Sequence, residues 1–129
     1  ALVVRSSTPQ PRRVTNGVDG SRVAMLLAVL ERRAGISLSD KDVYVSTVGG
    51  MRITEPAADL AIAIAIASAV TDKPVAQEVA AFGEISLSGE VRGVTNASQR
   101  KNEASRLGHK KIVDSSSAQL KKAIALALG

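Results

Sequence analysis

Few side chains in this sequence have a type and spacing that could support catalysis. The chain has one histidine, His109, and no cysteine, which excludes disulfides, thiolate zinc sites and a cysteine nucleophile. A Ser-His-Asp arrangement would recruit His109 from a short loop beside Gly108, where an exposed turn residue is the better interpretation. The hydroxyls of Ser115–Ser117 precede a predicted helix, and serine is favoured there as an N-cap.

The acidic residues and glycines form no recognisable ligand motif. Four carboxylates fall near predicted element ends, but no spacing matches a calcium loop or a catalytic pair: Asp40, Asp42, Glu55 and Asp59. We expect them to cap helices or lie on the surface. Gly49-Gly50 is not a nucleotide motif, and no Gly-x-x-x-x-Gly-Lys-Ser/Thr occurs. The sequence therefore predicts no metal site and no ATP binding by this chain itself.

The charge balance favours a polyanionic partner. Lys and Arg total 17 against 12 Asp and Glu, a formal net charge of +5, although a solvated basic face would give the same balance. The late lysines fall on predicted helices or near a strand, where they more often solvate a face: Lys101, Lys110, Lys111, Lys121 and Lys122. The only aromatic residues are Tyr44 and Phe82, so stacking platforms for single-stranded nucleic acid are not available.

Arginines mark loops and element ends instead. The planar guanidinium suits phosphate, and loops can present several such groups to one backbone. The sequence therefore predicts a DNA-contact patch of four residues: Arg13, Arg22, Arg52 and Arg92. The alternative is that some of them form structural or subunit salt bridges with Asp19, Glu55 or Glu90.

These residues must be positioned by alternating strands and helices. Strands are predicted at Ala1–Arg5, Asp42–Val48, Val79–Leu87, Glu90–Arg92 and Lys111–Val113, with a loop or hairpin over Ser6–Gly20. Helices are predicted at Ser21–Ala34, capped by Ser21, and at Ala57–Val70, Ala97–Leu107 and Ser116–Leu128. Ala57–Val70 is ambiguous, since Ile62, Ile64 and Ile66 alternate with alanine as in a strand, but its length and alanine content favour a buried helix.

This order predicts one α+β domain over residues 1–129, a mixed sheet covered by helices. A hydrophobic fraction of 45% is enough for a core. The longest apolar run, Leu60–Ala67, is far too short to span a bilayer. The N-terminus lacks a signal-peptide pattern and an initiator Met, so we expect a fragment of a longer, cytoplasmic protein.

Two segments resemble the Lon peptidase domain. Thr54–Ala61 matches the Gly-Pro-Ser-Ala-Gly helix start, and Phe82–Arg92 matches the Thr-Gly-Glu-Ile-Thr-Leu hairpin. The segments Arg12–Gly17 and Arg22–Glu31 resemble the version of this domain found at the carboxy-terminus of bacterial RadA-type recombination proteins. The resemblance covers essentially the whole chain and implies a Lon-protease-like fold, of the ribosomal-protein-type domain-2-like class. Gly93 departs from the pattern, which has proline there.

The resemblance also implies that this domain is not an enzyme. Lon peptidases use a serine nucleophile and a lysine base, and these two positions fall on Ala57 and Ser98. Without a nucleophile and its base, peptide hydrolysis by this mechanism has no chemistry available. An unorthodox peptidase is the least favoured interpretation.

What the resemblance implies instead is a DNA-binding and hexamer-scaffold domain of a branch-migration motor in recombination and repair. The partners would be single- and double-stranded DNA, bound without sequence preference, further copies of the same protein, and the RecA recombinase, with no membrane. ATP, Mg and Zn would belong to upstream ATPase and zinc-finger domains, and the whole protein would be a DNA-dependent ATPase. The alternative is a purely structural oligomerisation domain without DNA contact.

Overall fold

Strands and helices alternate along the computed structural model, which describes all of residues 1–129. The strands are β1 (Leu2–Arg5), β2 (Arg13–Asn16), β3 (Lys41–Ser46), β4 (Val79–Ala81), β5 (Glu84–Ile85), β6 (Val91–Arg92) and β7 (Lys111–Val113). The helices are α1 (Gly20–Arg33), α2 (Asp59–Thr71), α3 (Ala97–Arg106) and α4 (Leu120–Leu128), with 3-10 turns η1 (Pro56–Ala58) and η2 (Ser115–Ser117). The predicted α+β class is confirmed, with the strands in three small sheets. None of the helices has the length and apolar character needed to cross a membrane.

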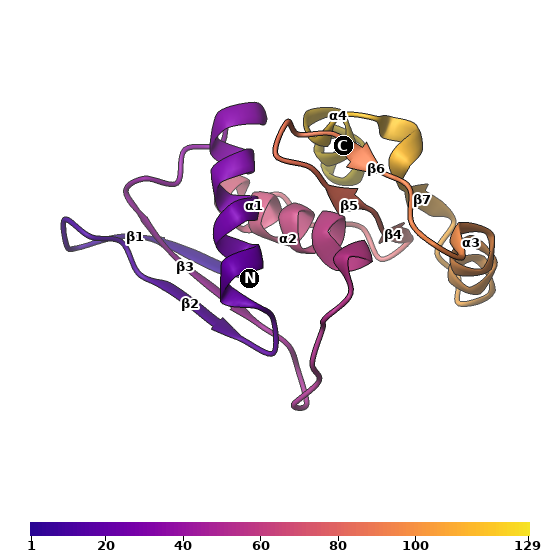
Figure 1. Cartoon of the computed structure of the whole chain (residues 1–129), viewed down its shortest axis with the longest axis horizontal. Coiled ribbons are helices and arrows are strands. Elements are labelled where there is room, and N and C mark those ends of the chain that lie inside the picture. The colour runs from indigo at the N-terminus through magenta and orange to yellow at the C-terminus, as the bar shows by residue number, and fades with distance from the viewer.

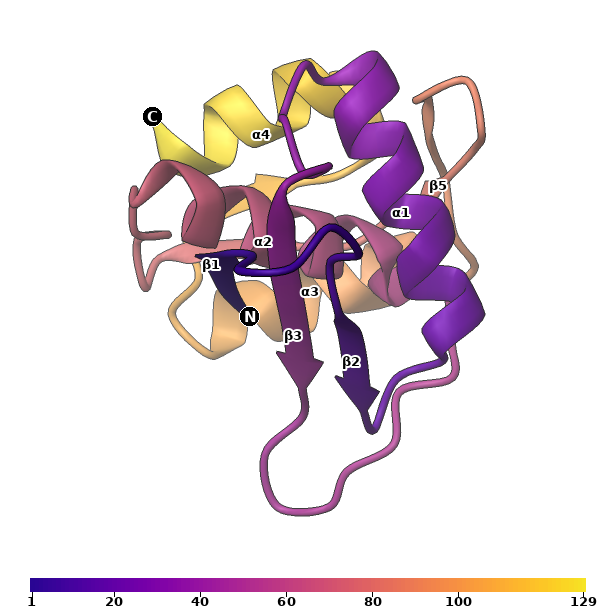
Figure 2. The same ribbon diagram turned by 90° about the vertical axis from the view of Figure 1, so that its left-hand side faces the viewer.

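The first sheet has the order β1-β3-β2, with β3 antiparallel to β1 and parallel to β2. Strand β2 lies within the segment predicted only as a loop or hairpin. Side chains alternate along a strand, so β3 buries Val43 and Val45 against the helices. Its other face carries Tyr44, with Leu2 and Val14 opposite it on the two neighbouring strands. Figure 2 looks onto this sheet, with α2 behind it.

Helix α2 lies at the centre of the molecule and packs against α1, α4 and strands of all three sheets (Figure 1). Leu60, Ala63, Ile66 and Ala67 are fully buried. A helix that is apolar on nearly all sides belongs in the interior, and α2 lies there between α1, α4 and the sheets. The predicted buried helix is confirmed, and it ends at Asp72 in the left-handed conformation.

The predicted continuous strand Val79–Leu87 is wrong, because the chain changes sheets at Phe82–Gly83. Strand β4 pairs in parallel with β7, whereas β5 pairs with β6 in the hairpin. The Gly83 N–H donates to the carbonyl oxygen of Ala57 at 2.9 Å. A Cβ at Gly83 would lie 2.7 Å from Cγ1 of Val91, so only glycine allows this approach.

Two helix starts also differ from the prediction, since aspartates cap where serines were expected. Asp19 accepts from the Ser21 N–H at 3.1 Å and caps α1. Asp114 accepts from Ser116 N–H and Oγ at 3.1 and 2.7 Å, which places Ser115–Ser117 in η2 and delays α4 until Leu120. Burial raises the pKa of Asp114, but the hydrogen bonds from Ser116 and the Lys101 ammonium outweigh burial and hold that pKa below its usual value.

Candidate functional site

Ala57, at the position of the Lon nucleophile, lies in η1 immediately before α2. Its side chain is buried. It lines a cavity of about 400 Å³ together with Arg52, Phe82 and Arg100. The lining includes no lysine or histidine, and its one hydroxyl belongs to Thr54. A nucleophile needs an adjacent base, and the residues around Ala57 offer no such pair.

Ser98, at the position of the Lon lysine, lies exposed at the start of α3 and outside the lining of this cavity. Arg100, on the same helix, does reach the cavity. Its Nη2 donates to Oε2 of Glu55 at 3.0 Å and its Nε to the Thr95 carbonyl at 3.1 Å. The sole histidine is elsewhere, with Nδ1 of His109 2.9 Å from the Gln77 carbonyl oxygen.

Arg22 is held by a buried carboxylate. It donates from Nε to Oδ1 of Asp59 at 2.8 Å and from Nη2 to Oδ2. Asp59 is 1% exposed and also accepts from the Ile85 N–H at 3.1 Å. The hydrogen bonds to Asp59 raise the pKa of Arg22 above its usual value. The surface or capping role predicted for Asp59 is therefore wrong: this carboxylate joins α1, α2 and β5. A lone acid in an otherwise apolar helix is a signal for such a buried pair.

Asp40 and Glu55 lie at the surface, as predicted, and Asp42 is half-buried. Asp40 pairs with Lys41 at 3.0 Å, and the Lys41 ammonium holds the pKa of Asp40 below its usual value. Asp42 accepts from the Arg12 backbone N–H at 2.6 Å. No three histidine, aspartate or glutamate side chains in the chain are grouped so that they could hold a metal ion.

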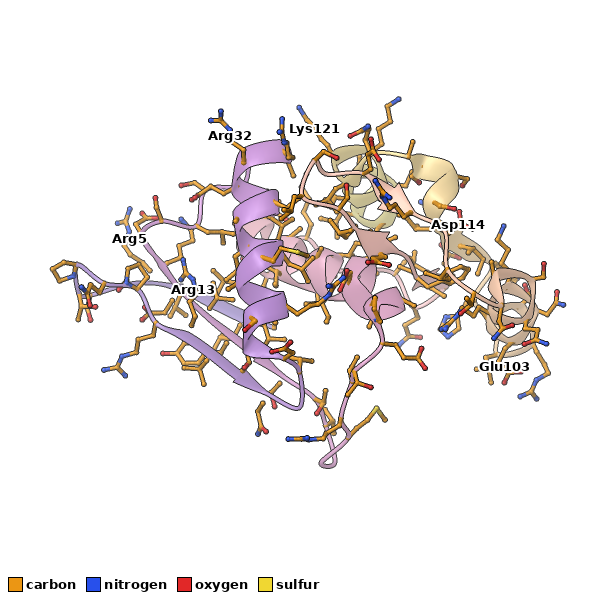
Figure 3. All side chains as sticks on the ribbon, in the orientation of Figure 1. Arg5, Arg13, Arg32, Glu103, Asp114 and Lys121 are labelled. Atoms are coloured by element: carbon orange, nitrogen blue, oxygen red, sulfur yellow. The ribbon has the colours of Figure 1, made fainter.

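Arg13 binds backbone carbonyl groups of its own chain. Its Nη2 donates to the Leu38 carbonyl at 3.0 Å and its Nη1 to the Lys41 carbonyl. These bonds tie the start of β2 to the segment that leads into β3. Arg13 lies at the end of β2 away from the 47–52 loop (Figure 3).

Arg52 is exposed and makes no side-chain hydrogen bond or ion pair. A bridge between Val18 and Ile53 places it beside the start of α1. It lines a second cavity of about 350 Å³ with residues 17–19, among them the capping carboxylate of Asp19.

Arg92 is 63% exposed and has only a loose contact, 3.6 Å from Nη2 to Oε2 of Glu90. It lies opposite Glu84 in the hairpin, and Oε1 of Glu84 is 3.6 Å from Nη2 of Arg22. Arg22 and Arg92 therefore lie on either side of Glu84. Arg52 lies beside the start of α1, the helix that carries Arg22. Arg13 is separate from these three residues. Three acids were predicted as possible partners of the four arginines: Asp19, Glu55 and Glu90. Only Glu90 contacts one of them, Arg92.

A further group of cations was not predicted as a site. Arg32 and Arg33 end α1, Lys73 follows α2, and Lys121 and Lys122 begin α4. Arg32 and Lys121 lie at the same end of the molecule (Figure 3). We call these five residues the α1–α4 basic cluster. They are far apart in sequence, so no local motif marks them. Lys101, by contrast, pairs with Asp114 at 3.1 Å.

Comparison with known proteins identifies relatives over most of the chain. Residues 21–117 match the family described as subunit ChlI of Mg-chelatase. The DNA repair protein RadA of Salmonella typhimurium is 43% identical over 113 residues, 88% of this chain and 25% of that protein. RadA of Rickettsia felis is 48% identical over 113 residues, which is again 88% of this chain and 25% of that protein. RadA of Streptococcus pyogenes serotype M1 is 46% identical over 112 residues, 87% of this chain and 25% of that protein.

The chain thus spans about a quarter of the length of the curated relatives it matches. The matched region and the α+β fold agree with the resemblance found in the sequence. The chain belongs to the ChlI/Lon-like domain family and is homologous to the carboxy-terminal domain of bacterial RadA DNA repair proteins.

Proposed function

We propose that this chain is a DNA-contacting and assembly domain of a DNA repair protein and has no peptidase activity. The observation that carries the proposal is Arg52, an exposed arginine without an intramolecular partner beside the start of α1, in a chain of net charge +5. Its relatives are named DNA repair proteins. The buried Ala57, in a cavity without lysine or histidine, argues against peptide hydrolysis.

Arg52 and Arg92 are the members of the predicted patch best placed to contact phosphate. Both guanidinium groups are exposed, and neither is held by a close ion pair. Arg13 and Arg22 are engaged by carbonyl groups and by Asp59, so we assign them mainly to positioning the elements that carry the patch. Contacts to the phosphate backbone carry no sequence information, so we expect binding without sequence preference. Single and double strands both offer such phosphates, so both are expected to bind.

In the longer relatives, the domain would form part of a hexameric ring that drives branch migration with ATP. ATP, Mg and Zn would be bound by other parts of the protein, and RecA would be a protein partner. The present chain would supply basic surface and subunit contacts to that ring.

The proposal is tested by fluorescence-anisotropy titration of the chain against labelled single- and double-stranded DNA at several salt concentrations. Binding should weaken as salt rises, with a slope of log affinity against log salt of about −0.9 per phosphate contacted on duplex DNA and about −0.7 on single strands. No binding at the lowest salt concentration would contradict DNA contact.

A purely structural oligomerisation domain is the second candidate, favoured by the outer face of the first sheet. Leu2, Val4 and Val14 are 57%, 42% and 47% exposed there, around Tyr44. Apolar residues gathered on one exposed face are typical of interaction surfaces. Sedimentation velocity of the chain and of its Val14→Lys variant tests assembly through this face. Together with the DNA titration it distinguishes the two functions, because a scaffold alone would assemble through this face and bind no DNA.

A further inference from the structure

An apolar hollow of about 300 Å³ lies between the carboxyl ends of α1 and α2 and one side of α4. Its walls are mainly the side chains of Ala34, Ile36, Ile124, Ala125 and Leu128. This volume is at the lower end of the range for binding pockets. It suits one bulky apolar side chain better than an extended ligand.

The rim of this hollow is basic. Lys73 and Lys121 line it, Arg32 and Arg33 end α1, and Lys122 follows Lys121 in the first turn of α4. None of the five side chains makes an ion pair or a side-chain hydrogen bond. The stem of Arg33 packs against the turn at Gly89, where a Cβ would lie 2.8 Å from Cβ of Arg33.

The nearby acids do not neutralise the cluster. Asp72 precedes Lys73 in the chain without pairing with it, and Oε1 of Glu31 accepts the Leu38 N–H at 2.9 Å. Glu90, next to Gly89, is 3.6 Å from Arg92. A group of exposed cations without acidic partners attracts an anionic partner.

The surroundings favour a peptide over a nucleic acid. The apolar walls of the hollow give a phosphate group no hydrogen bonds, so only the lysines at the rim could contact one. Both aromatic residues lie outside the hollow, so bases would have no ring to stack on. The hollow also borders the carboxyl ends of α1 and α2, and helix carboxyl ends present carbonyl groups. A peptide backbone brings N–H donors to such groups, whereas a phosphodiester brings none.

We propose that this hollow and the α1–α4 basic cluster bind an acidic peptide segment of a partner protein through one bulky apolar side chain. The apolar side chain enters between Ile36, Ile124 and Leu128. Flanking carboxylates meet Lys73, Lys121 and the arginines at the end of α1. This site is separate from Ala57 and from Arg52, and it does not depend on the DNA-contact proposal.

The test uses a fluorescein-labelled peptide with one phenylalanine between stretches of aspartate and glutamate, titrated against the whole 129-residue chain. Exposed Ala125 lines the hollow, so Ala125→Phe fills it without entering the core. We expect Ala125→Phe, and separately the Lys73→Glu/Lys121→Glu double variant, to weaken peptide binding at least about ten-fold. A peptide with serine in place of phenylalanine should lose a similar factor.

Lys110→Glu is the control for charge, since Lys110 is exposed and lies away from the hollow; it should change the affinity less than two-fold. Thermal melts confirm that each variant is folded. Equal binding of the serine peptide, or unchanged binding by Ala125→Phe, would overturn the proposal because charge alone would then explain the affinity. The proposal would also be overturned if the native chain bound no peptide and Lys73→Glu/Lys121→Glu lost DNA binding. The cluster would then be a nucleic-acid surface.

Discussion

Arg22 and Arg52 lie near the same end of α1, yet their surroundings give them different roles. Arg22 is bound to Asp59, which is 1% exposed, whereas Arg52 has no partner in its own chain. Both are arginines at element ends, the feature that suggested DNA contact. Residue type and position in a loop therefore identify candidate DNA contacts, but intramolecular partners decide which cations are free to bind a ligand.

The buried acid is the reason that Arg22 is held. A carboxylate removed from water needs compensating charge or hydrogen bonds, and Asp59 obtains them from Arg22 and from the Ile85 N–H. Moving Arg22 onto a phosphate would leave Asp59 without its cation. Arg52 could turn to a phosphate without any such cost.

The largest effect expected from this comparison is on stability, at Asp59. Asp59→Ala leaves Arg22 without its partner and the Ile85 N–H unsatisfied. We expect a loss of about 2–4 kcal/mol in the free energy of unfolding, below the cost at a fully buried pair because Arg22 is partly exposed. Urea unfolding measures it, with Asp40→Ala as the control, where no measurable change is expected. A loss at Asp59 no larger than at Asp40 would contradict the structural role of Arg22.

Lys101, like Arg22, is held by an acid, in this case Asp114. Asp114→Asn should lower the free energy of unfolding by about 1–2 kcal/mol at neutral pH, since it removes the charge that Lys101 and Ser116 stabilise. The folded-state pKa of Asp114 lies below its usual value. Its stabilising effect is therefore complete well above the unfolded pKa of about 4 and is lost as pH falls through the lower folded value.

Urea unfolding of both proteins between neutral pH and pH of about 3 checks this dependence. The stability difference between the native chain and Asp114→Asn should shrink once the pH drops below about 4. A difference that stays constant over this range would show that the carboxylate charge is not what stabilises η2.

A smaller effect is expected at Arg13, which binds carbonyl groups from the exposed surface. Arg13→Ala should cost about 1 kcal/mol in the free energy of unfolding, because solvent competes for these bonds. The adjacent Arg12→Ala is the matched control, since the Arg12 side chain makes no hydrogen bond and only its backbone N–H contacts Asp42. If both variants were equally stable, the carbonyl bonds of Arg13 would not hold its side chain. Arg13 would then be a candidate DNA contact, as Arg52 is.

Much of the fold could be predicted because its signals are local. The spacing of Val23, Leu26, Leu27 and Leu30 predicts α1, and strand Lys111–Val113 has the predicted bounds. The break at Gly83 could not be predicted, because it depends on pairing of β4 with β7, far away in sequence. The caps were misassigned because serine and aspartate both suit that position, and the tertiary structure selected Asp19 and Asp114.

The candidate site was predicted only in part, for the same reason. Ala57 and Ser98 follow from a motif match within the sequence, whereas the partners of Arg22 and Arg13 depend on Asp59, Leu38 and Lys41 from other elements. The α1–α4 basic cluster joins three helix ends. No one-dimensional spacing rule brings such residues together.

DNA contact by the unheld arginines is tested by the salt dependence of DNA affinity for the native chain and for Arg52→Ala/Arg92→Ala. We expect the double variant to bind DNA more weakly whatever the DNA sequence. The slope of log affinity against log salt concentration should fall in magnitude by about 2, one phosphate contact per arginine. Arg106→Ala is the control, since it removes an exposed arginine that pairs with Glu103 on α3. Unchanged affinity and slope in the double variant would contradict the claim that the unheld arginines contact DNA.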